Sequence, residues 1–199
     1  MVRLAMTRKR LVVGLTGSFG TGKSTVSRIL KGLGARKVID ADRLSHEVFR
    51  RHHPIGRRIK SLFHINGVLS RNKVAKEVFQ DPAKRKCLEA LIHPYVLRRI
   101  REELKPIQSG IVILEVPLLF EAHFDRLCDV TVSVLANERA IIERLVKRSF
   151  DAKEVRKRLK AQLPQSEKKK RSDFFIINSG SKELLVQKTK LVWKKLKSV

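Results

Sequence analysis

The chain has 199 residues, of which 42% are hydrophobic, so it is long and apolar enough to bury the core of one α/β domain with additions. With 45 Lys and Arg against 19 Asp and Glu, its formal net charge of +26 excludes an acidic protein and favours polyanionic ligands. No apolar run approaches the ~18 residues of a membrane-spanning helix, and the stretch before Leu11 is too short for a removable presequence. We therefore expect no membrane association and a cytoplasmic location.

The excess of positive charge has two explanations that the sequence leaves open. A nucleotide site needs only a few cations, so the remainder either binds nucleic acid non-specifically or forms a solvated surface. The basic residues are spread along predicted helices and are not interleaved with aromatic residues that could stack on bases. This favours the solvated surface and predicts no specific nucleic acid partner, only weak binding that salt abolishes.

Two cysteines, Cys87 and Cys128, are far apart, and neither belongs to a C-x-x-C pair. No histidine stands at a metal-ligand spacing from them. We expect both to be small buried residues in a reducing compartment.

The strongest signal is a phosphate-binding loop at residues 17–24, GSFGTGKS. It fits the pattern G-x-x-x-x-G-K-[ST], and it lies between an apolar run from Leu11 and a helical run over 26–33. Glycines let successive backbone N–H groups reach phosphate oxygens, and the following helix N-terminus attracts the same anion. The ATP-binding residues predicted here are Gly20, Thr21, Gly22, Lys23, Ser24 and Thr25, with Lys23 beside the β- and γ-phosphates and the Ser24 hydroxyl placed to bind Mg²⁺.

A second short strand is predicted over Lys37–Asp40, and it delivers two acids, Asp40 and Asp42, to the carboxyl end of a parallel sheet. Doubly wound folds place their ligands at that edge. Strand periodicity does not rank the two acids, because both lie at or beyond the strand end. Either acid can also cap the helix that begins near Arg43, and Asp42 is the better placed for capping.

From Arg43 to Pro106 the apolar residues recur at three- and four-residue spacings, which predicts a helical insertion. Its basic side chains are candidates for anion contact or for solvated surface. Four breaks divide it into several helices: His53-Pro54, Asn66-Gly67, Asp81-Pro82 and His93-Pro94.

A continuous apolar run over 111–116 predicts a central strand buried on both faces. Glu115 stands at its end. This carboxylate either holds Mg²⁺ through water or pairs with a nearby Arg, and the sequence does not decide between the two.

The remaining chain alternates strands and helices. Strands are predicted over 129–135 and 174–177, and helices over 137–148 and 181–196. The helix over 151–162 is strongly charged with a narrow apolar stripe, which is typical either of a mobile lid that closes over a triphosphate or of an ordinary surface helix. The run Lys168–Arg171 is predicted to be solvated.

Six ordered motifs resemble the dephospho-CoA kinase family along nearly the whole chain. They are GLTGSFGTGKSTV, VIDADRLSHEVF, GVLSR with VFQDPAKRKCLEALIHPYV, VPLLFE, an RLVKR helix running to AQLP, and DFFIINSGS. Adenylate kinases differ, because their loop contains a proline that is absent here. GTPases differ as well, since Asn72-Lys73-Val74-Ala75 lacks the aspartate of their guanine-reading motif.

This resemblance implies a P-loop kinase fold, with a five-stranded parallel sheet in the order 2-3-1-4-5 flanked by helices. Residues 1–42 and 107–199 would form the nucleotide-binding core, with a lid at about 144–166, and residues 43–106 would form the helical substrate domain. Independently of the resemblance, we expect the chain to be a monomer.

The implied reaction is phosphoryl transfer from MgATP to the ribose 3′-hydroxyl of dephospho-CoA. By resemblance, Asp42 accepts the hydroxyl proton, Arg148 clamps phosphates from the lid, and Asn178 lies near the adenine. Arg71 and His93 would contact dephospho-CoA, although His93 can instead anchor a helix end. The segment between Arg50 and Leu69 departs from the family pattern, since it is short and unusually basic.

Two other functions are compatible with parts of the sequence. Another small-molecule or nucleoside kinase would share the phosphate loop, and a basic nucleic-acid-binding protein could use that loop as a switch. Activity with dephospho-CoA, nucleosides and nucleoside monophosphates distinguishes these alternatives.

Overall fold

The computed structural model describes residues 9–199, apart from the side chains of residues 76, 79 and 80. The chain divides into two compact units. One comprises the chain up to Ile39 together with Ile107–Val199, and the other is Asp40–Pro106. Each unit is described by itself below.

A five-stranded parallel sheet forms the centre of the larger unit, in the order β2-β3-β1-β4-β5. This confirms the expected fold and strand order. The strands are β1 (Leu11–Thr16), β2 (Lys37–Asp40), β3 (Ile111–Glu115), β4 (Val130–Leu135) and β5 (Phe174–Ile177). Their central members are buried along nearly their whole length, as expected for a sheet with both faces covered.

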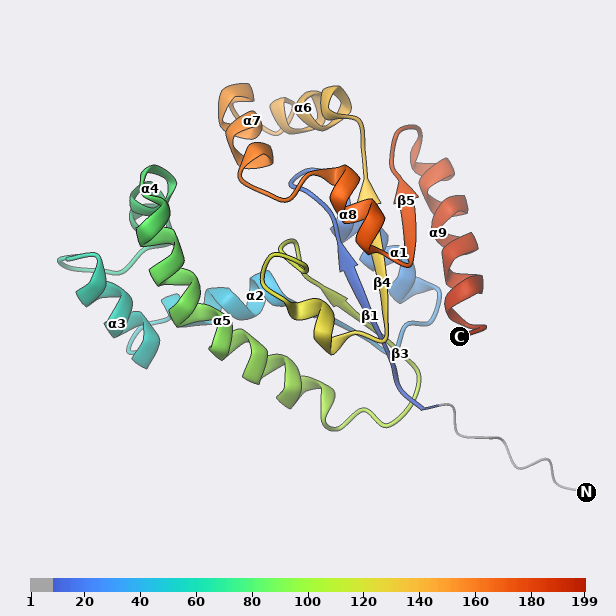
Figure 1. The fold of residues 1–199 in the computed structure, drawn as a ribbon, viewed down its shortest axis with the longest axis horizontal. Coiled ribbons are helices and arrows are strands. Elements are labelled where there is room, and N and C mark those ends of the chain that lie inside the picture. Colours follow the sequence, from blue (N-terminus) through green and yellow to red (C-terminus); the bar gives the residue numbers. More distant parts are fainter. Residues whose placement is uncertain (1–8) are drawn as a thin grey trace, which may run out of the picture. The chain divides into compact units, whose positions relative to one another are not determined.

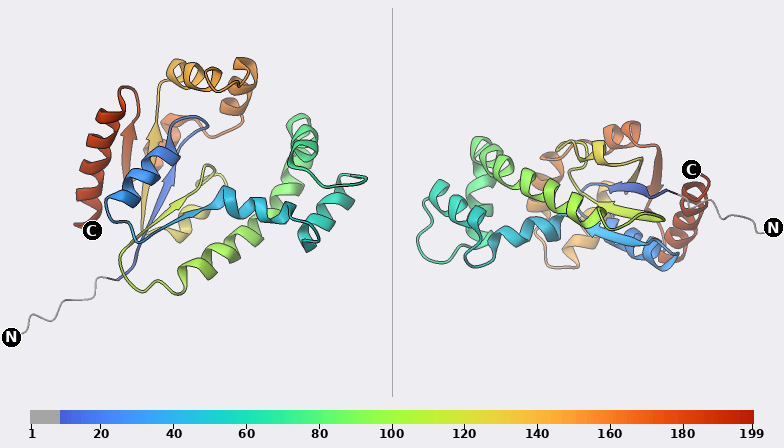
Figure 2. Two further views of the ribbon diagram at one scale, coloured as in Figure 1. Left: turned by 180° about the vertical axis from the view of Figure 1, so that it is seen from behind. Right: turned by 90° about the horizontal axis from the view of Figure 1, so that it is seen from below.

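Helices cover both faces of this sheet (Figure 1). On one face, α1 (Lys23–Gly32) packs against α9 (Lys182–Leu196), which Figure 2 shows from behind. On the other face, α8 (Gln165–Arg171) packs against β4. The larger unit also contains the 3₁₀ helix η2 (Phe124–Leu127) and the helices α6 (Glu138–Val146) and α7 (Ala152–Lys160).

The unit Asp40–Pro106 is helical, as its spacing predicts. It contains α2 (Ala41–His46), the 3₁₀ helix η1 (Glu47–Phe49), α3 (Pro54–Leu62), α4 (Arg71–Gln80) and α5 (Pro82–Leu104). Three of the four predicted breaks are confirmed: His53 and Asp81 cap α3 and α5, each followed by proline at the first helical position, and residues 66–67 lie between helices.

The predicted break at His93-Pro94 is wrong, because α5 continues through Pro94. A proline inside a helix removes one backbone hydrogen bond and crowds the preceding turn, at a cost of about 3 kcal/mol. Buried side chains on both sides of it, Ile92, Tyr95 and Val96, keep the helix in place. Tertiary packing therefore overrides the local signal.

Three further expectations need correction. Asp40, rather than Asp42, caps α2, since its Oδ1 accepts from the Arg43 N–H at 3.1 Å. Cys87 is exposed on α5, where the sequence predicts a buried residue. Lys168, in the run expected to be solvated, is completely buried. The exposure of Cys87 and the burial of Lys168 depend on a packing direction that spacing alone does not determine, and the cap is decided by the start of α2 at Ala41.

Candidate functional site

The phosphate-binding loop lies between β1 and α1, as predicted. Gly20 and Gly22 adopt φ angles of 77° and 98°, a backbone region that side-chain-bearing residues rarely enter. A Cβ on Gly22 would also collide with the side chain of Asn178. The two glycines therefore allow the backbone of the loop to curve, and Gly22 also allows Asn178, the residue after β5, to approach the loop closely.

Lys23 is folded back against the inside of this curve. Its Nζ donates to the carbonyl oxygens of Gly17 at 2.8 Å and Ser18 at 3.3 Å, and the side chain is buried. The Thr21 hydroxyl donates to the same Ser18 carbonyl at 2.9 Å. The loop therefore holds a positive charge at the place where the motif binds phosphates.

Glu115, at the end of β3, faces the start of α1. Its Oε1 accepts from the Ser24 hydroxyl at 2.8 Å, and its Oε2 accepts from the Ser27 hydroxyl at 2.6 Å. The expected alternative, a pairing with Arg, is not what the structure contains, because both recorded partners are serines. A buried carboxylate beside the predicted metal-binding hydroxyl is an oxygen donor set of the kind that Mg²⁺ prefers.

Asn178 connects the phosphate loop to the end of β5. The side-chain Nδ2 of Asn178 donates to the Thr21 carbonyl at 2.8 Å, and the backbone carbonyl of Asn178 accepts from Nη2 of Arg144 at 2.9 Å. In the part of the chain that the structure describes, Nη1 of Arg144 is buried without a partner. This guanidinium beside Asn178 therefore retains hydrogen-bonding capacity for a ligand.

Arg148 lies two residues beyond the end of α6. The helix α6 ends at Val146, so Arg148 does not continue the face that carries Arg144, and its side chain is exposed. The clamp role of Arg148 was expected from the family resemblance alone. Arg144 and Arg148 are four residues apart, a spacing that shares one face of a continuous helix, and the end of α6 separates them here.

The helix α7 packs beside the phosphate loop and is not a freely solvated element. Its Val155 is fully buried in a cluster with Ile141 and Leu145 of α6, against which Phe19 of the loop packs. The Phe19 and Phe150 rings meet edge to face at 5.4 Å, and the Arg158 guanidinium lies 5.0 Å from the Phe19 ring centre. These contacts join the predicted lid to the phosphate loop.

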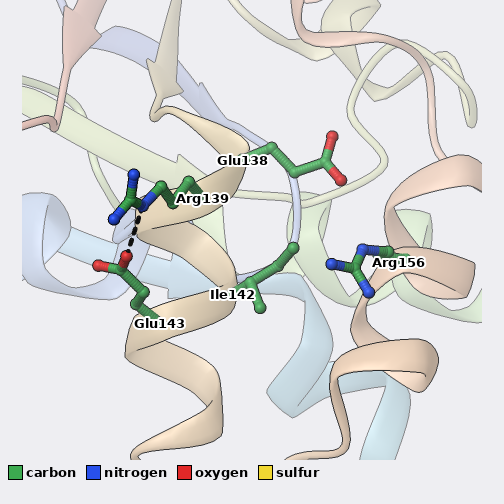
Figure 3. A pocket seen from close by; sticks show the side chains of 5 residues that line it. All are labelled: Glu138, Arg139, Ile142, Glu143 and Arg156. Carbon is green, nitrogen blue, oxygen red and sulfur yellow. Dashed lines mark hydrogen bonds and ion pairs between the residues drawn. The ribbon is translucent and has the colours of Figure 1, made fainter.

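A hollow of about 290 Å³ lies between α6 and α7 (Figure 3). Arg139 and Glu143 pair along its α6 side, and Arg156 of α7 stands opposite Glu138. No residue of the phosphate loop lines it.

Three residues predicted to serve the acceptor substrate lie in the helical unit. Asp42 is exposed in the first turn of α2, and Arg71 is the first residue of α4. Nη1 of Arg71 lies 3.4 Å from Nδ1 of His46, so the imidazole accepts from the guanidinium. Burial is the main cause that lowers the pKa of His46, and the charge of Arg71 adds to it. The charges of Asp42 and Asp40 oppose this shift without reversing it. The imidazole is therefore neutral at pH 7 and remains an acceptor.

His93 lies within α5 and is half-buried, so the alternative that it anchors a helix end is wrong. Burial lowers the pKa of its imidazole, with Glu89 opposing the shift. The side chain is therefore neutral at pH 7 and can both donate and accept a hydrogen bond.

The fully buried Lys168 was missed by the sequence analysis. Its Nζ donates to Glu121 Oε1 at 2.7 Å and to the Pro117 carbonyl at 2.9 Å. The same carbonyl accepts from the Thr16 hydroxyl at 3.1 Å, one residue before the phosphate loop. Lys168 therefore ties α8 to the chain that follows β3 and, through it, to the base of the loop.

Comparison with known proteins identifies relatives along nearly the whole chain. The family model described as dephospho-CoA kinase matches residues 11–183. The dephospho-CoA kinase of Carboxydothermus hydrogenoformans is 39% identical over 181 residues, which cover 86% of this chain and 87% of that protein. The crystal structure of TT1252 from Thermus thermophilus superposes with a TM-score of 0.82 at 35% identity, covering 95% of this chain and 99% of that one. The dephospho-CoA kinase from Campylobacter jejuni matches with a TM-score of 0.66 at 25% identity, covering 95% and 98%.

Proposed function

The chain belongs to the dephospho-CoA kinase family and is an ATP-dependent phosphotransferase with an alcohol acceptor. We propose how its residues transfer the γ-phosphoryl group of ATP to the ribose 3′-hydroxyl of dephospho-CoA. The family match over residues 11–183, which includes the phosphate loop, carries the proposal. Chemistry of this kind needs alignment and charge neutralisation more than covalent catalysis.

The phosphate loop binds the triphosphate. Backbone N–H groups of residues 20–25 donate to phosphate oxygens, and Lys23 exchanges its carbonyl partners on Gly17 and Ser18 for the β- and γ-phosphates. Since the ammonium already lies inside the loop, little rearrangement is needed. At the transition state its charge offsets the negative charge that spreads over the transferred group.

Ser24 and Glu115 are the residues that would hold Mg²⁺, with the Ser24 hydroxyl binding directly and Glu115 acting through water. The hydrogen bond between them supports this assignment, because it places a hydroxyl and a carboxylate together at the amino end of α1. Among the described residues, no group of three or more His, Cys, Asp or Glu side chains is arranged for a metal. When bound, Mg²⁺ neutralises phosphate charge.

Asn178 and Arg144 are proposed to bind the adenine side of ATP. The Asn178 amide is already bonded to the phosphate loop, and the adjacent Arg144 has an unpartnered Nη1. Arg148 stays the predicted phosphate clamp of the lid, and its exposure leaves it accessible to ligand.

Asp42 is proposed to orient the 3′-hydroxyl and to accept its proton, while Arg71 and His93 bind dephospho-CoA. The N-cap of α2 is Asp40, and Asp42 is an exposed residue of the first turn. His46 holds the Arg71 guanidinium from one side. Arginine in this role provides a planar donor group for a phosphate of the acceptor.

The substrate assignment is tested by ADP release in the presence of MgATP and a panel of acceptors. Dephospho-CoA should stimulate turnover strongly, whereas adenosine and AMP should do so poorly, because they lack the pantetheine portion that the helical unit would bind. A clear preference for AMP or a nucleoside would favour the alternative of another small-molecule kinase.

The location of the enzyme, its oligomeric state and its binding to nucleic acid are further parts of the proposal. In the described residues, no helix has the length and apolar character that crossing a membrane requires. We propose a cytoplasmic, monomeric enzyme. Its net charge of +26 is expected to give only weak, sequence-blind nucleic acid binding that is lost as salt rises.

A further inference from the structure

Gln162 reaches the phosphate loop from a distant part of the chain. It lies two residues beyond the end of α7, and its Oε1 accepts from the Phe19 N–H at 2.9 Å across 143 residues of sequence. Because a backbone N–H only donates, the orientation of the carboxamide is determined: the oxygen faces Phe19, and Nε2 is the remaining end of the same planar group. In the described part of the chain, no hydrogen bond from this Nε2 to protein is recorded.

The chain around Gln162 is held in place on both sides. The next N–H, that of Leu163, donates to Glu121 at 3.0 Å. Gln165 pairs with both backbone groups of Ala136, at 2.9 Å each. On the α7 side, Arg158 lies over the Phe19 ring. Gln162 is therefore held beside the loop and loses little conformational entropy when it acts there.

We propose that Gln162 binds the triphosphate of ATP, its Oε1 holding the Phe19 N–H while its Nε2 donates to a phosphate oxygen. Phe19 lies between Gly17 and Gly20, in the half of the loop that precedes residues 20–25. The Nε2 donor of Gln162, held at Phe19, therefore adds to the backbone N–H groups of residues 20–25 that bind phosphate. The half-buried amide would gain a charged acceptor, the stronger kind of hydrogen bond. The proposal deepens the proposed function and depends on ATP binding alone, whichever acceptor is used.

Two substitutions separate phosphate binding from loop support. Gln162→Glu retains an oxygen for the Phe19 N–H but replaces the Nε2 donor with a negative oxygen. Gln162→Met retains length and volume but removes both polar ends. If Gln162 only supports the loop, the Glu variant binds ATP like the wild type and the Met variant binds ATP more weakly. If Gln162 donates to phosphate, the Glu variant binds ATP more weakly than the Met variant does, because it adds repulsion to the lost bond.

The readout is the dissociation constant of ATP and of AMP, measured by calorimetry without any acceptor. Gln162→Glu should weaken ATP binding by roughly 10- to 100-fold, as expected for the loss of a hydrogen bond to a charged group, and Gln162→Met by less, with AMP binding nearly unchanged. Gln187→Glu, an exposed change on α9, is the matched control for charge. The ratio of the two constants is independent of the folded fraction, so a less stable variant remains interpretable.

ATP binding by Gln162→Glu at the wild-type affinity, or a Met variant weaker than the Glu variant, would overturn the proposal. Either result would leave the substrate assignment untouched. Conversely, loss of the dephospho-CoA preference in the acceptor panel would not alter this measurement.

Discussion

Replacing Asp42 by Asn is expected to lower kcat by roughly 10² to 10⁴, the span for one positioned acid–base group. In a loose phosphoryl-transfer transition state, the attacking hydroxyl needs orientation and, late in the reaction, a proton acceptor. An amide retains the hydrogen-bonding shape but does not take the proton. The KM for ATP should change little, because the phosphate loop is unaltered. Initial rates at saturating dephospho-CoA and ATP give kcat directly.

The structure supplies the control for this experiment. Asp40 caps α2 through the Arg43 N–H, so Asp42→Asn leaves the cap intact. Asp40→Asn is the matched variant, since Asn is itself a good capping residue and should preserve the helix. Near-normal turnover by folded Asp42→Asn, together with inactive Asp40→Asn, would show that the two acids are ranked wrongly.

Replacing Lys168 by Met is expected to lower the free energy of unfolding by about 3 kcal/mol, the lower end of the range for breaking a buried ion pair. The side chain is 0% exposed, and its loss leaves Glu121 without its ammonium partner. The lower end applies because Glu121 is 23% exposed and water can partly replace the lost charge. Met fills much of the space, so little cavity contributes. Urea unfolding at constant m-value measures the change.

Two further variants show whether the buried pair causes that loss. Lys170→Met, an exposed change in the same helix, should stay within about 0.5 kcal/mol of the wild type. Combining Lys168→Met with Glu121→Gln should recover part of the stability, because no unpaired carboxylate then remains. Burial lowers the pKa of Lys168 despite Glu121, which indicates that the ion pair offsets desolvation incompletely. Wild-type stability in Lys168→Met would contradict this account.

The fold was predictable because its signals are local. The glycine pattern at residues 17–24 fixes a loop between strand and helix, and apolar runs mark the strands. The order of the strands came from the family resemblance, since local patterns do not specify which strands become neighbours. His53-Pro54 and Asp81-Pro82 worked as helix starts because capping is also a local interaction.

Most of the failures involve packing between distant segments, whereas the cap of α2 was assigned to the wrong one of two neighbouring acids. Pro94 is tolerated inside α5 because of the side chains buried around it, and Lys168 is buried because Glu121 and Pro117 lie opposite. The contact of Gln162 with Phe19 joins residues that share no local pattern. Arg144 and Arg148 share the RLVKR motif, and the end of α6, which spacing does not give, separates them; the clamp role of Arg148 stays a prediction.

The central claim is tested most directly by the identity of the product. After incubation with MgATP and dephospho-CoA, the account predicts CoA that carries one new phosphoryl group on the ribose 3′-oxygen, identified by mass spectrometry and phosphorus NMR, with ADP formed in equal amount. A dephospho-CoA analogue without the 3′-hydroxyl should remain unmodified. Phosphorylation of that analogue, or a phosphoryl group at any other position of dephospho-CoA, would contradict the account.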